Sequence, residues 1–252
     1  MQIDENTILV ESDGIQIKKA KPPSITVSND LRPNTKPKFK VGQKLKYNYN
    51  TIIYGSYKNL KLEYEVKGID IMDHKKCYNV EIKEEHLMLS SSTRVTSKEK
   101  NISQDEEIHN EYLSSCIDVE NGEIKYLIKK DTNENMINEE RKYKEGIGIY
   151  APWMLALDDN MKWKVSINTS EYIDNPNIVL HENFEVVERE VVNNKECFKV
   201  VVSHTSETTK GLEKVDKRVI MWINVNERII EKGQVFVGNL KTDEITLVDE
   251  TI

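Results

Sequence analysis

The sequence predicts a mainly β protein: a curved antiparallel sheet, or half-barrels, made of two tandem and diverged copies of one module. Two observations support this prediction. From about residue 41 onward, apolar and polar residues alternate with a period of two, as in strands with one dry and one solvated face. In addition, a stretch of the first half recurs in the second half, which indicates an internal repeat.

The alternation is clearest in three runs of the first half, at residues 45–49, 60–66 and 78–82. Each run is predicted to be a strand of an antiparallel sheet. Short polar stretches at residues 73–76 and 192–195 separate such runs, and we expect hairpin turns there.

The repeat aligns residues 64–82 with residues 184–202 at an offset of 120 and without a gap. Five of the 19 aligned positions are identical, whereas typical residue frequencies give about one identity by chance. Two shorter blocks keep the same order: 41–47 with 157–163 at an offset of 116, and 116–119 with 222–225 at an offset of 106. The offsets differ because loops between strands vary in length.

These patterns divide the chain into four parts. Residues 1–40 are polar and contain four prolines, and are predicted to be an extended N-terminal tether. Residues 41–142 form β module 1, and residues 157–252 form β module 2. Between them, residues 143–156 form an apolar connector, in which Pro152 disfavours a regular helix or a central strand. We expect the connector to lie across the concave side of the sheet.

Charge and hydropathy exclude several functions. The net charge is −7, with acids and bases interleaved, so the chain offers no basic stripe to a nucleic acid. No stretch approaches the roughly 18 apolar residues of a membrane-spanning helix. Residues 1–6 do not look like a secretory signal. We therefore expect a cytoplasmic protein, or an extracytoplasmic one whose signal or anchor lies outside this sequence.

The histidines do not form a recognisable catalytic or metal motif. His74 and Cys77 have the spacing of metal ligands, but no second pair completes a site, and the repeat has Asn194 in place of the histidine. His181 and His204 could serve as general bases, yet no nucleophile or phosphate-binding motif accompanies them. We therefore predict no catalytic residue, no metal and no cofactor, and that the protein is not an enzyme.

The three cysteines are too few for a disulfide scaffold. They fit a reduced compartment, or one disulfide and a free thiol outside the cell. Because Cys77 and Cys197 occupy equivalent positions of the repeat, a bridge between them is one possibility. Cys116 aligns with Trp222, so it is predicted to be a small apolar filler.

Tyr150, Trp153 and Met154 form the one cluster suited to an apolar ligand, because aromatic and thioether groups supply adaptable contact area. The alternative interpretation is that these three side chains fill the core between the two modules.

Four stretches of the chain resemble a known group of proteins. They are VGQKLKY at 41–47, APWMLALDDNMKW at 151–163, KECFKV at 195–200 and MWINVNERII at 221–230. They are similar to strand motifs of bacterial and archaeal domains of unknown function in the DUF3108-like and LolA-like lipoprotein group. The resemblance implies strongly curved antiparallel half-barrels with an apolar concave face, and many members are exported or carry lipids. The chain departs from the pattern in lacking a lipobox cysteine, and in having Asp158 and Asp159 where the group has Val-Gly.

The sequence thus favours a non-enzymatic binding or scaffold protein that holds an apolar or lipid-like ligand in a concave β face. One alternative is a structural or protein-interaction module on the cell surface. Another is a hydrolase with an unrecognised active site, which a cleft shared by His181, His204 and carboxylates would favour.

Overall fold

The computed structural model describes residues 7–12, 15–20, 25–27, 31–53, 56–96, 99–130, 146–168, 179–208 and 211–252. Almost all of the regular structure in these ranges is β strand; a 3-10 helix, η1 (Pro152–Ala156), lies in the connector. The described residues include no helix of the length and apolarity needed to cross a membrane. The predicted mainly β class is confirmed.

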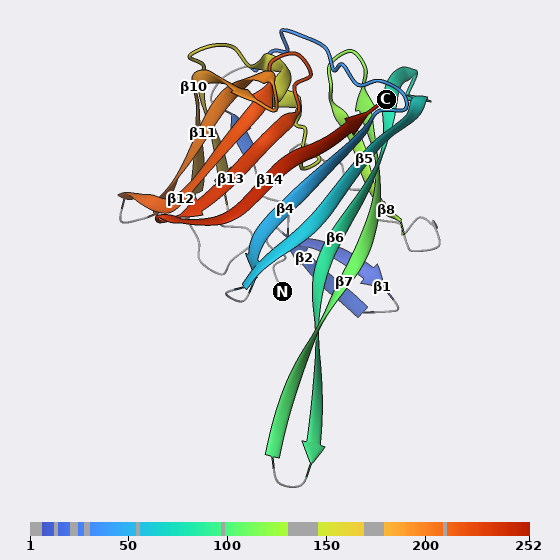
Figure 1. The fold of residues 1–252 in the computed structure, drawn as a ribbon, viewed down its shortest axis with the longest axis vertical. Helices are drawn as coiled ribbons and strands as arrows, with labels where there is room; N and C mark the ends of the chain where they lie inside the picture. Colours follow the sequence, from blue (N-terminus) through green and yellow to red (C-terminus); the bar gives the residue numbers. More distant parts are fainter. Residues whose placement is uncertain are drawn as a thin grey trace.

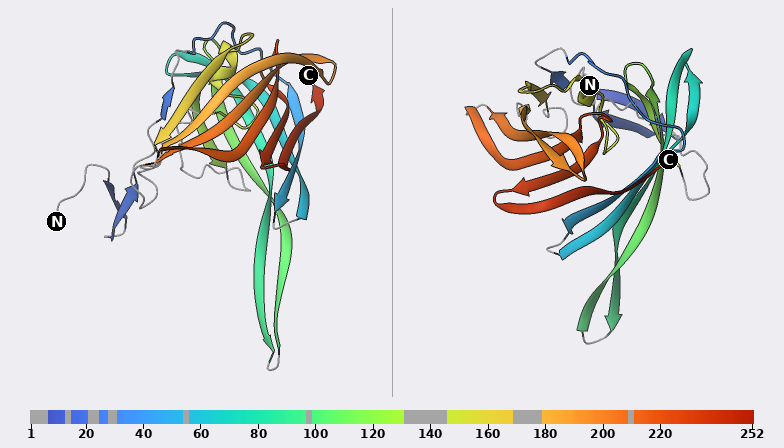
Figure 2. Two further views of the ribbon diagram at one scale, coloured as in Figure 1. Left: turned by 90° about the vertical axis from the view of Figure 1, so that its left-hand side faces the viewer. Right: turned by 45° about the horizontal axis from the view of Figure 1, so that its top comes forward.

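Twelve strands form one antiparallel sheet, and two more strands form a separate hairpin. The sheet is curved, and its linear strand order leaves it open (Figures 1 and 2). Its order is β3 (Ile25–Val27), β9 (Lys162–Asn168), β10 (Val179–Val192), β11 (Lys195–Thr208), β12 (Gly211–Asn224), β13 (Ile230–Val237), β14 (Leu240–Thr251), β4 (Lys44–Ile53), β5 (Ser56–Met72), β6 (Lys75–Thr96), β7 (Glu99–Asp118) and β8 (Ile124–Lys130). The separate hairpin consists of β1 (Thr7–Ser12) and β2 (Ile15–Ala20).

Strand β14 joins the two halves of the sheet. It pairs with β13 on one side and with β4 on the other. The strands of module 1 and module 2 therefore belong to one continuous sheet rather than to two separate half-barrels. The hairpin of β6 and β7 extends past the strands that flank it and projects from the body as a long arm (Figure 1).

The long hairpins of the two halves have the same geometry. Asp73 and His74 turn β5 into β6 with φ values of 49° and 63°, and Asn193 and Asn194 turn β10 into β11 with φ values of 51° and 61°. Two adjacent residues with positive φ are typical of a two-residue hairpin turn whose twist matches the strands. A bulge also follows residue 66 in β5 and residue 186 in β10. Both features obey the predicted offset of 120.

The closing turns of the two halves are also alike, at the predicted offset of 106. The side-chain oxygen of Asp118 accepts hydrogen bonds from the backbone N–H groups of residues 120 and 121. Asn224 accepts the same two bonds from residues 226 and 227. These correspondences are what a duplication would produce, although the duplication itself stays a prediction, as does the division into tether, modules and connector.

The first strands of the two halves, β4 and β9, correspond to each other at an offset that differs from the predicted one. Leu45 lies opposite Tyr64, and Trp163 lies opposite Phe184. The structural offset is therefore 118, whereas matching Lys-Tyr to Lys-Trp gave 116. The motif was misleading because a two-residue slip keeps every side chain on the same face, so alternation alone does not fix the register.

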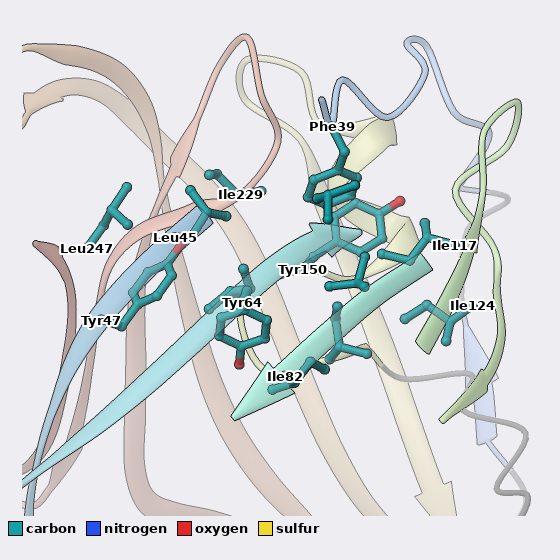
Figure 3. Packing of buried hydrophobic residues seen from close by; sticks show 14 of the residues in the cluster. Phe39, Leu45, Tyr47, Tyr64, Ile82, Ile117, Ile124, Tyr150, Ile229 and Leu247 are labelled. Atoms are coloured by element: carbon teal, nitrogen blue, oxygen red, sulfur yellow. The ribbon is translucent and has the colours of Figure 1, made fainter. Parts of the chain in front are cut away.

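Two apolar clusters lie on the concave side of the sheet. One lies under β4–β7 and includes Tyr47, Tyr64 and Ile117 (Figure 3). The other lies under β9–β13 and includes Phe184 and Phe198. The segment 146–157 contributes to both, and residue 34 binds it from the N-terminal side by a backbone hydrogen bond of 3.0 Å to the carbonyl of residue 155.

The disulfide corrects the prediction for the cysteines. Cys77 is bonded to Cys116, and Cys197 is a buried free thiol. A Cys77–Cys197 bridge is therefore wrong, and so is the interpretation of Cys116 as a filler. In the β6–β7 register Cys77 lies opposite Asp118 and Cys116 opposite Asn79, which makes the two cysteines diagonal neighbours on one face. Burial raises the pKa of the Cys197 thiol to about 12, so this thiol is unreactive.

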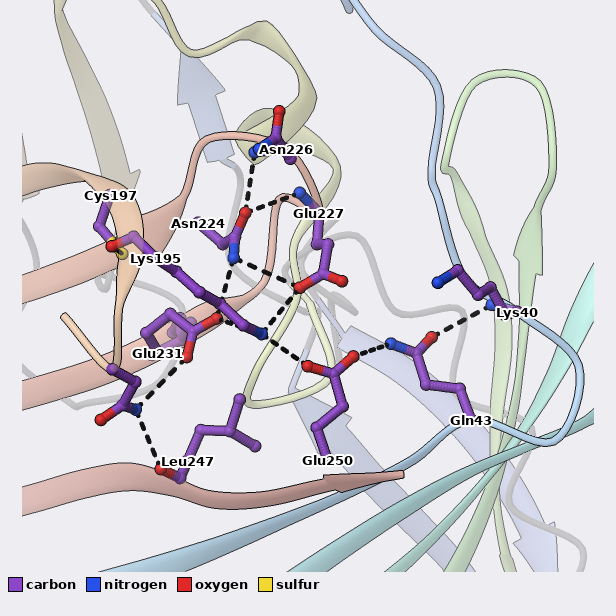
Figure 4. Close-up of polar contacts among 12 residues, drawn as sticks. Lys40, Gln43, Lys195, Cys197, Asn224, Asn226, Glu227, Glu231, Leu247 and Glu250 are labelled. Carbon is purple, nitrogen blue, oxygen red and sulfur yellow. Dashed lines mark hydrogen bonds and ion pairs between the residues drawn. The ribbon is translucent and has the colours of Figure 1, made fainter. Parts of the chain in front are cut away.

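A polar cluster connects the ends of several strands near β14 (Figure 4). The ammonium group of Lys195 lies 2.6 Å from Glu250, 3.0 Å from Glu231 and 3.1 Å from Glu227. Glu231 is fully buried and also accepts a hydrogen bond of 3.0 Å from the Asn224 amide. Because its members come from β11, β13, β14 and the β12–β13 turn, the cluster fixes these elements to one another.

Candidate functional site

A cavity of about 230 Å³ lies between the connector and the concave face of the second half. The connector contributes the wall formed by residues 146–154. Strands β10, β11 and β12 contribute the opposite wall with the apolar side chains of Phe184, Val202, Val219 and Met221, and Ile230 of β13 also lines the cavity. The sheet positions alternate with residues that face the convex side, so strand geometry places all four on one face.

All three predicted ligand residues lie in the wall of this cavity. Tyr150 is almost fully buried, and its hydroxyl donates a hydrogen bond of 3.0 Å to the carbonyl of Gly122. Met154 is also buried, within the second apolar cluster. Trp153 remains half-buried. Tyr150 and Met154 thus fill the core as well as lining the cavity, and Trp153 is the one whose ring has surface left for a ligand.

Trp153 belongs to a cluster of three aromatic rings. Its ring centroid lies 5.3 Å from that of Trp163 and 5.5 Å from that of Phe184. The rings of Trp163 and Phe184 stack at 4.7 Å with an interplanar angle of 12°. Stacked rings hold one another in fixed orientations, so they present a rigid apolar surface.

Three polar residues complete the wall of the cavity. Glu182 and His204 lie directly opposite each other on β10 and β11, with 3.3 Å between His204 Nε2 and Glu182 Oε1. His204 Nδ1 lies 3.1 Å from the carbonyl oxygen of Lys217, where a bulge interrupts the β11–β12 pairing. A mainly apolar cavity with a few fixed polar groups is the usual form of a small-molecule site.

His181 lies on the opposite face of the sheet from His204. It precedes Glu182, the partner of His204, and neighbouring residues of a strand point to opposite faces. Its Nδ1 is 2.9 Å from Ser166 Oγ, and its Nε2 is 3.0 Å from Glu207. The two histidines therefore do not share a cleft, so the arrangement that would favour the hydrolase alternative is not found at these residues.

The row of Ser166, His181 and Glu207 has the residue types of a catalytic triad, and the sequence reasoning did not find it. Ser166 lies in the middle of β9, between β3 and β10, so its backbone is engaged in sheet pairing on both sides. Catalysis of acyl transfer needs free N–H groups aimed at the developing oxyanion. Since a mid-strand serine offers none, we interpret the row as a structural hydrogen-bonded chain.

The predicted absence of a metal site concerns His74 and Cys77. His74 is exposed in the β5–β6 turn, and Cys77 is consumed by the disulfide. Within the described ranges, no three His, Cys, Asp or Glu side chains are arranged to hold a metal ion.

Comparison with known proteins gives no family for this chain. No protein-family model and no curated protein matches it. Among solved structures, it is similar to a protein of Bacteroides fragilis described as exported and as having a YmcC-like fold, with 10% identity and a TM-score of 0.37 over 88% of this chain and 98% of the other. A protein of Parabacteroides distasonis described as a lipoprotein has 12% identity and a TM-score of 0.36 over the same shares. Such scores assign neither a family nor a function, and the resemblance to the DUF3108-like and LolA-like group stays a prediction.

Proposed function

We propose that the protein is a non-enzymatic binding protein that holds the apolar part of a ligand in the cavity between the connector and β10–β12. One observation carries the proposal: Trp153, Val219 and Met221 keep exposed apolar surface around a concave space, on the side of the sheet where the core lies. Removing such surface from water stabilises a complex by roughly 25 cal/mol per Å².

The size of the cavity limits the ligand. Its volume of about 230 Å³ is smaller than the roughly 300–1,000 Å³ of sites for drug-sized molecules. It therefore suits one short acyl segment or a single small ring rather than a whole lipid. Glu182, His204 and Lys217 also line this cavity, so its wall contains polar residues besides the apolar ones.

The test uses the apolar fluorophore 1-N-phenylnaphthylamine and two substitutions in adjacent residues of β12. Val219→Trp places an indole in the cavity, whereas Ile220→Trp places it on the convex face. We expect the wild type and Ile220→Trp to enhance the fluorescence of the probe, and Val219→Trp to lose this enhancement while keeping a wild-type unfolding temperature. Equal binding by both variants, or no binding by the wild type, would refute the proposal.

We also propose that the protein works in an oxidising, extracytoplasmic compartment. The Cys77–Cys116 disulfide supports this proposal, since such bonds persist outside the reducing cytosol. Alkylation of the protein under denaturing conditions without reductant should label one thiol after export to a bacterial periplasm. Labelling of three thiols in the exported protein would contradict the proposal.

A further inference from the structure

Tyr64 carries a buried hydroxyl without a partner. Its side chain is 2% exposed, and its ring packs edge-to-face on Tyr47 with centroids 5.9 Å apart. No described residue accepts or donates a hydrogen bond at Tyr64 Oη. By contrast, the Tyr47 hydroxyl donates a bond of 2.8 Å to the carbonyl of Ile230. In Figure 3 the Tyr64 hydroxyl points away from Leu45 and Tyr150. Such a group is unfavourable unless something binds it.

Two carboxylates lie on the same concave face beyond Tyr64. Glu84 of β6 is directly opposite Glu111 of β7. His86 Nε2 lies between them, 3.5 Å from Glu84 Oε2 and 3.4 Å from Glu111 Oε2. Burial, and then the charge of Glu111, raise the pKa of Glu84, although His86 opposes this shift. After burial, the charge of Glu84 is the other cause that raises the pKa of Tyr64, so the phenol and the carboxylate are electrostatic neighbours.

The connector approaches the Tyr64 hydroxyl and also lines the proposed cavity. Gly148 lines the cavity, and a Cβ atom at this position would lie 2.7 Å from Tyr64 Oη. The residue also has a φ of +68°, which glycine adopts readily. Gly148 therefore lies beside both the Tyr64 hydroxyl and the cavity.

The second half does not repeat this acidic pair. The offset of 120 relates Glu84 to His204, and the offset of 106 relates Glu111 to Lys217. An acidic pair beside a buried tyrosine is thus a property of the first half.

We propose that the Tyr64 hydroxyl together with the Glu84 and Glu111 carboxylates binds a primary ammonium group. An ammonium group has three N–H donors and no acceptor, and the two carboxylates and the phenol oxygen are acceptors for it. It would supply the missing partner of Tyr64 and neutralise the charge of Glu84. The inference rests on the proposed function only in one respect: the ammonium would be the head group of the ligand whose apolar part occupies the cavity.

The experiment titrates the full-length protein with n-butylammonium, and separately with n-butanol, followed by amide chemical shifts. We expect saturable shifts around residues 64, 84 and 111 with butylammonium, and at least about tenfold weaker binding of butanol, because hydrogen bonds between charged partners are the strong ones. Glu84→Gln should weaken butylammonium binding by about tenfold, and Tyr64→Phe by several-fold. The matched control is Glu65→Gln, a change on the convex face in an ion pair of 2.8 Å with Lys67.

The unfolding temperature of the variants distinguishes ligand binding by these residues from a purely structural role. If the hydroxyl is unpartnered in the free protein, Tyr64→Phe keeps or raises the unfolding temperature while it weakens butylammonium binding. A destabilised Tyr64→Phe, or equal binding by the wild type and Glu84→Gln, would overturn the proposal. Val219→Trp should still bind butylammonium, so failure of the cavity proposal and failure of the ammonium proposal give different results.

Discussion

Lys195→Met tests whether the polar cluster near β14 stabilises the sheet. The substitution keeps most of the aliphatic volume but removes a cation that Glu227, Glu231 and Glu250 share. Loss of one partner from a buried ion pair costs about 3–5 kcal/mol, because the remaining charge is buried without compensation. Glu231 is fully buried, whereas the Lys195 side chain is 30% exposed and Asn224 still binds Glu231.

We therefore expect Lys195→Met to lower the free energy of unfolding by about 3 kcal/mol, the lower end of this range. For a domain of this size, that loss lowers the unfolding temperature by roughly 6–12 °C. Thermal and urea unfolding, followed by circular dichroism, measure both quantities. The control is Lys162→Met, which breaks an ion pair with Glu185 whose side chains are 68% and 47% exposed; exposed pairs contribute only about 0–1 kcal/mol.

A second change isolates the cause. In Lys195→Met, neutralising the buried carboxylate by Glu231→Gln should restore part of the lost stability, since the two residues interact directly. Burial raises the pKa of Glu250, but hydrogen bonds from Lys195 and Gln43 outweigh this and lower it overall. Its stabilisation is present above the unfolded pKa near 4.3 and is lost as pH falls through the folded value. If Lys195→Met loses no more stability than Lys162→Met at pH 7, the cluster is not a stabilising feature.

Three further predictions concern single groups. Cys116→Ser removes a disulfide that spans 39 positions and should cost about 4 kcal/mol by loop entropy; a wild type whose unfolding temperature is insensitive to reductant would contradict this. Tyr47→Phe should cost about 1 kcal/mol in urea unfolding because its buried hydroxyl is bonded, and Tyr64→Phe should cost none; similar losses in both would be inconsistent with an unpartnered Tyr64. The pKa of Glu84 is raised, so its favourable contribution is present below the unfolded value and is lost as pH rises. Glu84→Gln should therefore be more stable than the wild type at pH 7 but not at pH 3, and thermal unfolding at both pH values tests it.

Local features of the fold were predictable from the sequence, because strand alternation and turn chemistry are local. The turns at residues 73–74 and 193–194 lie within the polar stretches that the sequence marked. Long-range features were not predictable. The disulfide depends on the pairing of β6 with β7 across 39 residues, and the continuity of the sheet depends on β14 lying between β13 and β4. Neither arrangement leaves a periodic signal in the sequence.

The candidate site was predictable only for the residues that are adjacent in sequence. Tyr150, Trp153 and Met154 are adjacent in sequence and conspicuously apolar, so their composition marked them. Phe184 and Met221 belong to strands whose alternation was visible, but their shared face becomes evident only from the register of β10, β11 and β12. Of the polar residues of the wall, the sequence indicated His204 only as a possible general base, and it did not indicate Lys217, because charged residues also occupy the convex face.

The position of β14 has a consequence for biosynthesis. Its neighbour β4 is made about two hundred residues earlier, so β4 has no partner on that side until Leu240–Thr251 leave the ribosome. During translation the nascent chain must hold a strand edge open to other chains, and such edges promote aggregation. The sheet can therefore be completed only after nearly all of this sequence has been synthesised.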